Sequence, residues 1–141
     1  MVCIFCKIVS GEVPCVRVYE DDTVLCFLDI NPVEKVHTLV VLKRHAATLM
    51  ETLPQELSQV ILAVQKVSQA MMRCGADGIN VLVNNNAVAG QEVPHLHFHV
   101  IPRVAQSAPR NWKSGAARYE SAEEQAAVAA RLRDAIKNLQ I

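Results

Sequence analysis

The feature that most constrains the fold is a run of three histidines at alternating positions, His95, His97 and His99, inside an otherwise apolar stretch. Side chains of a β-strand point alternately to its two faces, so a strand over residues 93–101 places the three rings on one face, about 7 Å apart. The intervening Leu, Phe and Val side chains then lie on the opposite face and can pack in a core. The segment is therefore predicted to be a strand that ends at Pro102, with one face for packing and one for chemistry.

A row of three imidazoles needs its protonation states settled, because each ring titrates near neutral pH and adjacent charged rings repel. Hydrogen bonds can settle them when the N–H of one ring donates to a carbonyl or to the bare nitrogen of the next ring. The middle ring, His97, is then held neutral with one bare nitrogen directed outward, as a nucleophile for phosphorus or a carbonyl carbon. The pattern alone also permits a satisfied polar face, or a metal site built from alternating histidines.

The rest of the chain predicts an antiparallel sheet with helices packed on it. Two runs rich in β-branched and aromatic residues, 13–19 and 23–29, flank an acidic turn and predict a hairpin. Two further strands are predicted at 37–42 and 79–84, so that the sheet has five strands. One long helix is predicted between the third and fourth strands, and another at the C-terminal end. Short connections and hairpins favour an α+β layer fold in a single domain, residues 1–141.

Both helices are predicted from capping residues and apolar periodicity. Thr52 with Gln55 forms a capping-box pattern, and Pro54 lies in the first turn of the long helix. Ser121 with Glu124 forms a second capping box, which opens the final helix. The predicted buried stripes are Leu57, Val60, Ile61, Val64, Val67 and Met71 in the long helix, and Ala122, Ala126, Ala129, Leu132, Ile136 and Leu139 in the final one.

Bulk composition excludes several classes of protein. With 14 acidic and 14 basic residues the formal net charge is zero, so no nucleic-acid partner and no anionic membrane surface are expected. No stretch reaches the roughly 18 uncharged apolar residues of a membrane helix, and the first residues lack the pattern of a secretory signal. Five cysteines are an odd number, which does not suit a disulfide framework. A reducing, cytoplasmic location is therefore expected.

Several segments, taken together, resemble a known family. They are Gln91-x-Val93-x-His95-x-His97-x-His99-Val100-x-Pro102-Arg103, Ile4-Phe5-Cys6-Lys7-Ile8, Val18-Tyr19-Glu20-Asp21-Asp22, Phe27-Leu28-Asp29-Ile30-Asn31-Pro32 and His37-Thr38-Leu39-Val40-Val41. The pattern resembles the signature of the histidine triad (HIT) family, in which His-x-His-x-His is flanked by apolar residues. The resemblance covers residues 3 to about 103 and is weaker over 104–141, the C-terminal loop and helix.

The resemblance implies a nucleotide-binding α+β fold and a homodimer whose sheet continues across two subunits. It also implies attack on the α-phosphorus of a purine nucleotide, such as a nucleoside phosphoramidate or a dinucleotide polyphosphate. His97 would form a nucleotidyl intermediate that water hydrolyses to a nucleoside monophosphate, while His99 and His37 set its tautomer and geometry. The implied substrate-binding residues are Asp29 for the ribose hydroxyls, Phe27 and Ile30 for the base, and Asn84, Gly90, Gln91 and Val93 for the phosphate.

Physical chemistry supports several of these roles independently. Gly90 allows backbone N–H groups to approach a phosphate closely, and a carboxylate such as Asp29 suits the two hydroxyls of a ribose. The neutral amides of Asn84 and Gln91 can hydrogen-bond a phosphate without adding charge. Each residue also has a simpler interpretation, since Asp29 beside Asn31 could be a turn residue and Asn84 could cap a strand end.

Cys3-x-x-Cys6 has the spacing of a metal site, although the same spacing fits a redox pair or two unrelated thiols. A closed tetrahedral zinc site needs two further ligands. Some bacterial-type members of the resembled family bind zinc with two such cysteines, a histidine at the position of His45, and the first triad histidine, His95. The resemblance therefore implies a structural zinc on these four residues, tying the N-terminus to the active strand. Core thiols are predicted at Cys15, Cys26 and Cys74, which lie in apolar runs.

Two features leave the substrate open. Glu92 lies where the phosphoramidase branch typically has a serine, and the His-Val-x-Pro-Arg ending is more similar to the dinucleotide-cleaving branch. A basic segment follows, with Arg103, Arg110, Lys113 and Arg118, and with Trp112 and Tyr119 among them. This segment either neutralises a polyphosphate or stacks on a base, or is a solvated loop whose aromatic residues anchor the last helix.

Two other functional hypotheses remain open from the residues alone. One is a nucleotide- and zinc-binding scaffold with little turnover. A complete set of histidines favours an enzyme over such a scaffold, because binding alone does not need a free middle imidazole. The other is a thiol redox protein that uses Cys3 and Cys6, which lacks the usual strand-to-helix context.

Overall fold

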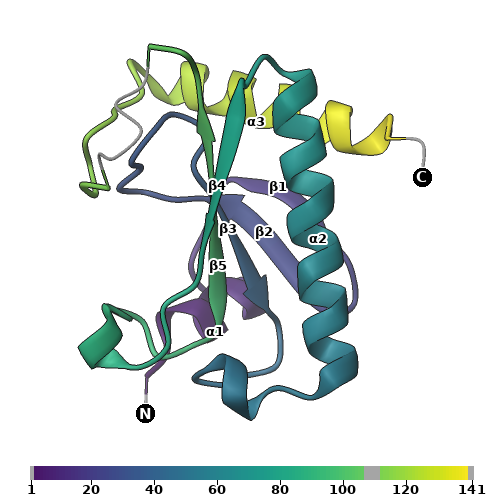
Figure 1. Ribbon diagram of the computed structural model, residues 1–141, viewed down its shortest axis with the longest axis vertical. Helices are drawn as coiled ribbons and strands as arrows, with labels where there is room; N and C mark the ends of the chain where they lie inside the picture. The colour runs from purple at the N-terminus through teal and green to yellow at the C-terminus, as the bar shows by residue number, and fades with distance from the viewer. Residues whose placement is uncertain (1, 107–111, 140–141) are drawn as a thin grey trace.

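The computed structural model describes residues 2–106 and 112–139, and these form a five-stranded antiparallel sheet with helices on its faces (Figure 1). The strands lie in the order β1-β2-β3-β5-β4. The elements are α1 (Ile4–Ser10), β1 (Arg17–Glu20), β2 (Val24–Leu28), β3 (Thr38–Leu42), η1 (Leu49–Glu51), α2 (Pro54–Arg73), β4 (Gly78–Leu82), η2 (Ala87–Ala89), β5 (His97–Arg103) and α3 (Ala122–Lys137). This is the α+β fold predicted from the sequence.

The sheet separates two apolar cores. The larger core lies between the sheet and the helices α2 and α3, and it contains Phe98 and Val100 of β5. Figure 1 shows α2 running along this face of the sheet. The smaller core lies under α1, where the ring of Phe5 meets the ring of Phe27 from β2 edge-on at a centroid distance of 5.7 Å. The two cores give the sheet one face covered by long helices and one face covered by a short helix.

The register between β3 and β5 decides which core the histidines face. His97 lies opposite Val41 and His99 opposite Leu39 in this antiparallel pair. Residues directly opposite each other point to the same face of a sheet, and both β3 residues belong to the smaller core. His97 and His99 therefore lie on the α1 face, while Phe98 and Val100 fill the larger core. The strand begins at His97 and not at residue 93 as predicted, so His95 lies in the bend that precedes it.

Helix α1 was not predicted from the sequence, for which the first predicted element was the strand over 13–19. Its N-cap is Cys3, whose sulfur accepts the Cys6 N–H at 3.4 Å, and it ends at Gly11 with a φ of 89°. Seven residues make only two turns, which is too few for the 3.6-residue periodicity to emerge from a sequence. The helix brings both cysteines to the histidine face.

The start of α2 lies later than the capping pattern predicted. Leu53 is the N-cap, and its N–H donates to the Glu56 carboxylate at 3.0 Å. The predicted cap, Thr52, instead donates its hydroxyl to the Leu49 carbonyl at 2.7 Å. Because Thr52 is engaged in the preceding turn, the helix begins at Pro54, whose missing N–H suits this position.

The buried faces of the two long helices agree in part with the predicted stripes. Ile61 is 48 % exposed, so its place in the stripe of α2 was wrong. The N-cap of α3 is Ser121, as predicted, and its hydroxyl accepts the Glu124 N–H at 3.0 Å. Ala122 and Ala126 are exposed instead of buried. The buried residues are Val60, Ala63, Val64, Val67, Ala70 and Met71 in α2, and Ala129, Leu132 and Ile136 in α3.

Strand β5 continues through Pro102, where the sequence analysis ended it. Strand β3 begins at Thr38, opposite Val100, so the part of β5 that follows Val100 pairs only with β4. A proline is tolerated where ladder hydrogen bonds are made on one side alone. Among the described helices, none combines the length and apolar character needed to cross a membrane.

Candidate active site and metal centre

The three alternating histidines form a continuous row of rings beneath α1. The ring centroids of His97 and His99 lie 5.0 Å apart, and Phe5 meets the ring of His97 edge-on at 4.9 Å and that of His95 at 5.9 Å. Phe5 was not among the predicted site residues, because α1 was not predicted from the sequence. The phenyl ring covers one flank of the row and leaves the rest of this face for a ligand.

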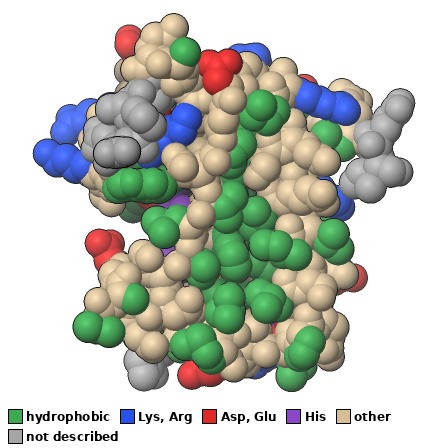
Figure 2. All heavy atoms as spheres, in the orientation of Figure 1, with side chains coloured by type: hydrophobic (Ala, Val, Ile, Leu, Met, Phe, Trp, Pro, Cys, Tyr) green, Lys and Arg blue, Asp and Glu red, His purple; other side chains and the backbone are tan. Residues whose placement is uncertain are grey.

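The tautomer of His97 follows from its hydrogen bond. Its Nδ1 lies 2.7 Å from the backbone carbonyl oxygen of His95, so Nδ1–H donates there and Nε2 keeps a bare lone pair. Burial lowers the pKa of the His97 imidazole below its ordinary value, which favours the neutral form. The side chain is 8 % exposed, and Figure 2 shows histidine surface within a recess of the molecule. A neutral imidazole with a bare nitrogen at a recess can act as a nucleophile.

The next ring, His99, is oriented by a hydrogen bond from His37, the last residue of the connection between β2 and β3. The backbone N–H of Val33 donates to Nδ1 of His37 at 3.0 Å, which leaves the proton of His37 on Nε2. This Nε2 lies 3.0 Å from Nδ1 of His99 and donates to it. The Asp29 carboxylate lies 3.5 Å from the same Nε2. The fixed direction of each bond orients the ring that stands beside His97.

Electrostatics keep this pair of rings neutral. Burial lowers the pKa of His99 to about 4, with smaller contributions from the neighbouring His97 and His37. Burial also lowers the pKa of His37, and the nearby Asp29 carboxylate opposes that shift only in part. Neutral rings can donate with one nitrogen and accept with the other, which a chain of directed hydrogen bonds requires.

The structure places the base- and ribose-binding candidates around the end of β2. Asp29 follows the strand and accepts the Asn31 N–H at 2.8 Å, as a turn residue would, while its second carboxylate oxygen faces His37. Ile30 is 86 % exposed, whereas Phe27 is buried in the smaller core. Asp29 therefore combines the turn role and contact with the histidines, and Ile30 offers an uncovered apolar side chain beside it.

The phosphate-binding candidates lie in the loop that contains η2. The Asn84 amide donates to the Gly90 carbonyl at 3.4 Å, and Gly90 has a φ of 97°, which a residue with a Cβ rarely adopts. Gln91 accepts the Asn86 N–H at 2.7 Å and donates to the Ala47 carbonyl at 2.6 Å. These contacts brace the loop internally.

The residues that follow this loop approach the triad. Val93 packs at the smaller core, beneath α1. Glu92 is exposed, and its charge acts on His97 by raising the pKa of that imidazole, although less strongly than burial lowers it. The loop thus leads directly into the histidine row and carries one acid at its edge.

The basic segment after β5 is divided between a buried arginine and exposed residues. Arg103 is buried, donates from Nε to Asn80 at 2.8 Å, lies 3.7 Å from the Glu34 carboxylate, and stands 5.1 Å from the ring of Trp112. Arg118 is exposed. Arg110 lies outside the described residues. Arg103 and Trp112 therefore contribute to packing at the end of the sheet.

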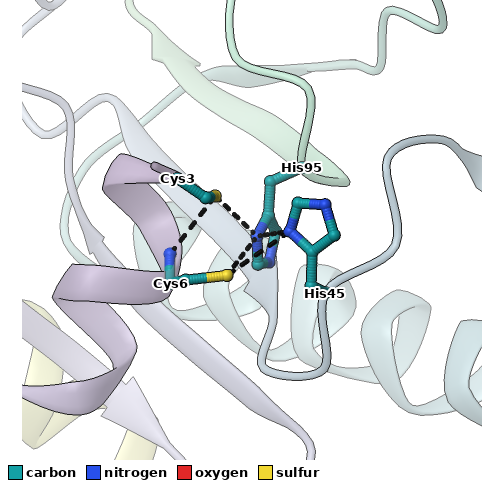
Figure 3. A group of neighbouring side chains, drawn as sticks. All are labelled: Cys3, Cys6, His45 and His95. Atoms are coloured by element: carbon teal, nitrogen blue, oxygen red, sulfur yellow. Dashed lines mark hydrogen bonds between the residues drawn. The ribbon is translucent and has the colours of Figure 1, made fainter. Parts of the chain in front are cut away.

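Cys3, Cys6, His45 and His95 converge at the N-terminal end of the row (Figure 3). The Cys3 sulfur lies 3.3 Å from Nδ1 of His95, and the Cys6 sulfur lies 3.4 Å and 3.6 Å from Nδ1 of His45 and His95. The two Nδ1 atoms are 3.2 Å apart. Ligands around a tetrahedral zinc ion are separated by about 3.3–3.8 Å when Zn–N is about 2.0 Å and Zn–S about 2.3 Å. The spacing and donor types therefore fit zinc.

The tautomer of His95 also suits a metal. Its Nε2–H donates to the backbone carbonyl of Leu42, so Nδ1 is bare and faces the two sulfurs. The remaining cysteines lie apart from this cluster. Cys26 is buried, as predicted, whereas Cys15 and Cys74 are only half-buried, and the Cys74 thiol donates to the Arg131 carbonyl at 3.8 Å.

Comparison with known proteins decides the family. The family described as HIT domain matches residues 10–106, more than half of the chain. The chain belongs to the HIT domain family. Among solved HIT structures, the zinc-bound histidine triad family protein from Mycobacterium smegmatis superposes with a TM-score of 0.84 at 34 % identity, covering 97 % of this chain and 94 % of that chain. Its similarity extends over the complete fold, including α3.

Two relatives of this HIT protein carry named activities. The adenylylsulfatase of Arabidopsis thaliana is 47 % identical over 102 residues, which is 72 % of this chain and 52 % of that protein. The chain thus spans about half the length of that relative. The adenosine 5′-monophosphoramidase of Schizosaccharomyces pombe is 46 % identical over 103 residues, 73 % of this chain and 75 % of that protein.

Proposed function

We propose that this HIT protein is a nucleotidyl hydrolase or transferase in which Nε2 of His97 attacks the α-phosphorus of a purine nucleotide. The observation that carries the proposal is the bond from His97 Nδ1–H to the His95 carbonyl, because it leaves Nε2 bare at the recess. The two named relatives act on adenosine phosphosulfate and phosphoramidate linkages by their names, which supports this substrate class.

The proposed reaction has two displacements at one phosphorus. The lone pair of His97 forms an N–P bond while the bond from phosphorus to the leaving group breaks, giving a nucleotidyl-histidine. Water then attacks the same phosphorus, the N–P bond breaks, and a nucleoside monophosphate leaves. His99, oriented by His37, holds the geometry of the reacting ring throughout. Leaving groups in this class are an amine, sulfate or a second nucleotide.

The substrate contacts are assigned by side-chain chemistry. Asp29 accepts the ribose hydroxyls, since its carboxylate already faces the triad. Ile30, which is 86 % exposed, supplies apolar surface to the purine, with Phe27 behind it. The amides of Asn84 and Gln91, the Gly90 backbone and Val93 surround the phosphate.

The metal cluster serves structure in this proposal. Zinc would be held by Cys3 at the N-cap of α1, Cys6 within α1, His45 from the connection after β3, and His95 before β5, as in the bacterial-type zinc subtype of the family. A bound zinc joins three segments that are distant in sequence and fixes the start of the histidine row. All five cysteines are free thiols in the described structure, which suits a cytoplasmic protein.

A homodimer is proposed through the edge strand β4. Val81 on that strand is 47 % exposed, and Ile61 and Met72 on α2 are 48 % and 47 % exposed. Figure 2 shows a central patch of hydrophobic side chains between β4 and α2. Pairing two β4 edges would continue the sheet and cover this patch. Sedimentation velocity should show a dimer that Val81→Lys disrupts, whereas Val88→Lys, at an exposed valine off this strand, should leave it intact.

The decisive experiment profiles turnover and intact mass together. The zinc-loaded protein is incubated with adenosine phosphoramidate, adenosine 5′-phosphosulfate, diadenosine polyphosphates and their guanosine counterparts. We expect hydrolysis of at least one of them and a transient mass increment of one nucleoside monophosphate, both absent in His97→Ala. An adduct that survives this substitution contradicts the proposal. No turnover by the parent across the panel, with nucleotide binding intact, would favour a binding scaffold instead.

A further inference from the structure

The turn before His37 contains an unusual backbone conformation. Val36 has a φ of 73°, in the left-handed region that β-branched residues rarely adopt. Within the described residues the only other non-glycine residue with positive φ is Asn86, a residue type that tolerates it. Such a conformation persists only where neighbouring structure holds it in place. The contacts around Val36 therefore show what holds His37.

The hold on Val36 comes from the segment that leads into α3. The backbone N–H of Val36 donates to the hydroxyl oxygen of Tyr119 at 2.7 Å, and the Tyr119 ring is half-buried against the larger core. On the following peptide, the Thr38 hydroxyl donates to the Val36 carbonyl at 2.7 Å. The side chain of Lys35 pairs with Glu124 at 2.9 Å, but both groups are largely solvated and contribute little. Tyr119 is thus the main anchor across the chain.

The same C-terminal segment also holds the rest of this turn. The Gly115 N–H donates to the Asn31 carbonyl at 3.0 Å, and the Ala117 N–H donates to the Pro32 carbonyl at 3.2 Å. The backbone from residue 31 to residue 36 is therefore positioned by residues 115–119, which lie about 80 positions later in the sequence. A displacement of residues 115–119 would therefore also displace residues 31–36.

The position of this turn determines the tautomer of His37. The N–H of Val33 donates to His37 Nδ1, and this bond directs the His37 proton from Nε2 to Nδ1 of His99. If the turn relaxes at Val36, the Val33 N–H shifts relative to the ring and the tautomer is no longer imposed. The orientation of His99 beside His97 would then be lost with it.

We propose that Tyr119 is a positioning residue for the triad: its hydroxyl holds the left-handed Val36 turn, which orients His37 and through it His99. Tyr119 touches no reacting atom in this scheme and acts only through the turn. The proposal rests on the proposed function for its kinetic consequence, although the structural link from Tyr119 to His37 can be measured without any substrate.

The test compares Tyr119→Phe with Tyr19→Phe in zinc-loaded protein. Tyr19 is the other tyrosine, and its hydroxyl is also bonded, to Asp21 and Lys66, on β1 away from the triad. We expect Tyr119→Phe to lower kcat roughly tenfold with KM within about twofold, since a small misplacement of a catalytic group has a large effect on rate. Tyr19→Phe should leave both constants within about twofold.

A second variant separates positioning from general destabilisation. Glycine adopts a φ of 73° without strain, so Val36→Gly makes the turn less dependent on the hydroxyl. Tyr119→Phe combined with Val36→Gly should regain most of the lost kcat at a temperature well below unfolding. A double variant no faster than Tyr119→Phe alone would overturn the proposal, and so would a Tyr119→Phe enzyme with unchanged kcat.

A spectroscopic readout makes the test independent of turnover. The ¹⁵N chemical shifts of the ring nitrogens should show His37 protonated on Nε2 and bare on Nδ1 in the parent and in Tyr19→Phe. In Tyr119→Phe these shifts should move toward averaged values for both His37 and His99. Unchanged shifts overturn the Tyr119 proposal. If the parent cleaves no nucleotide, the proposed function fails, and these spectra alone decide the role of Tyr119.

Discussion

His95 and His99 flank the same ring, and yet the two ends of the row are built for different tasks. At the metal end, His95 donates from Nε2 to the Leu42 carbonyl and turns a bare Nδ1 toward two sulfurs and a second histidine. At the opposite end, Nδ1 of His99 accepts from His37, so the same type of atom is engaged in a hydrogen bond. The comparison teaches that the group facing each ring, rather than its place in the alternation, decides its chemistry.

The two ends also differ in how they are assembled. The metal end brings α1, the connection after β3 and the residue before β5 together through four side chains whose spacing fits zinc. The His99 end is assembled by backbone groups of one turn, which the segment before α3 braces. We therefore expect the metal end to respond to chelation, and the His99 end to respond to pH and to changes in the turn.

The largest expected effect lies between the ends, at His97. His97→Ala should reduce kcat/KM by at least about 10⁴-fold, because removal of a nucleophile removes the covalent pathway. Zinc content and melting temperature should stay close to those of the parent, since neither end depends on this ring for its assembly. Steady-state kinetics with metal analysis checks this. Residual activity within tenfold of the parent would mean that His97 is not the nucleophile that the groups at the two ends position.

Breaking the metal end should lower stability strongly. Cys6→Ala should lose the bound zinc, and removing a ligand present at 1,000 times its Kd lowers the unfolding free energy by about 4 kcal/mol. Chelation of the parent should produce the same loss. Cys15→Ala is the matched control, since Cys15 is a half-buried thiol outside the cluster and its variant should keep one zinc per chain. Equal zinc content in both variants would contradict the assignment. Urea unfolding and atomic absorption make the measurements.

The pH response tests the His99 end. Because burial holds the pKa of His99 at about 4, the folded protein keeps this ring neutral while the unfolded chain takes up a proton near pH 6.5. Stability is therefore fully present above pH 6.5, falls as the pH drops toward 4, and loses about 3 kcal/mol from this group. In metal-free protein, His99→Asn should show a shallower decline over this window by urea unfolding. Parallel curves of unfolding free energy against pH for the parent and His99→Asn would contradict the assigned contribution of His99.

The smallest effect is expected at the turn itself. Val36→Gly should raise the unfolding free energy by about 1 kcal/mol, because relief of backbone strain exceeds the entropic disadvantage of glycine. The matched control is Val33→Gly, three residues earlier, where φ is not positive and the buried side chain is lost. That variant should be less stable than the parent. A destabilised Val36→Gly protein would show that the turn is not strained. Chemical denaturation resolves differences of this size.

Local sequence patterns predicted most of the fold, and the failures have identifiable causes. Runs of β-branched and aromatic residues predicted the first two strands, alternation predicted the histidine strand, and the serine cap placed the start of α3 correctly. Helix α1 was missed because seven residues do not show a helical period, and Ile61 was placed in the core because hydrophobicity alone cannot distinguish a buried face from an exposed apolar patch. With α1 missing, the contact of Phe5 with the triad could not be foreseen.

The residues of the site can likewise be separated into those that the sequence predicted and those that only the structure revealed. Its residue types and their alternation were readable, and the resemblance supplied His37, His45 and Asp29, which the structure brings to the row. Tyr119 was considered only as an anchor of the last helix or as a base-stacking residue. No sequence signal marks Val36, since a left-handed valine is a consequence of contacts made by residues far along the chain.

The sequence by itself determined that His97 and His99 share one face of a strand and that two thiols lie close together at the N-terminus, because the β-strand repeat and a three-residue separation are local geometry. The tertiary structure decided which nitrogen of His95, His37 and His99 is bare, whereas the partner of His97 is the His95 carbonyl two residues away. An imidazole carries two nearly equivalent nitrogens, and its proton goes where the partner group requires. Those partners, the Leu42 carbonyl and the Val33 amide, arrive from other elements only when the chain is folded.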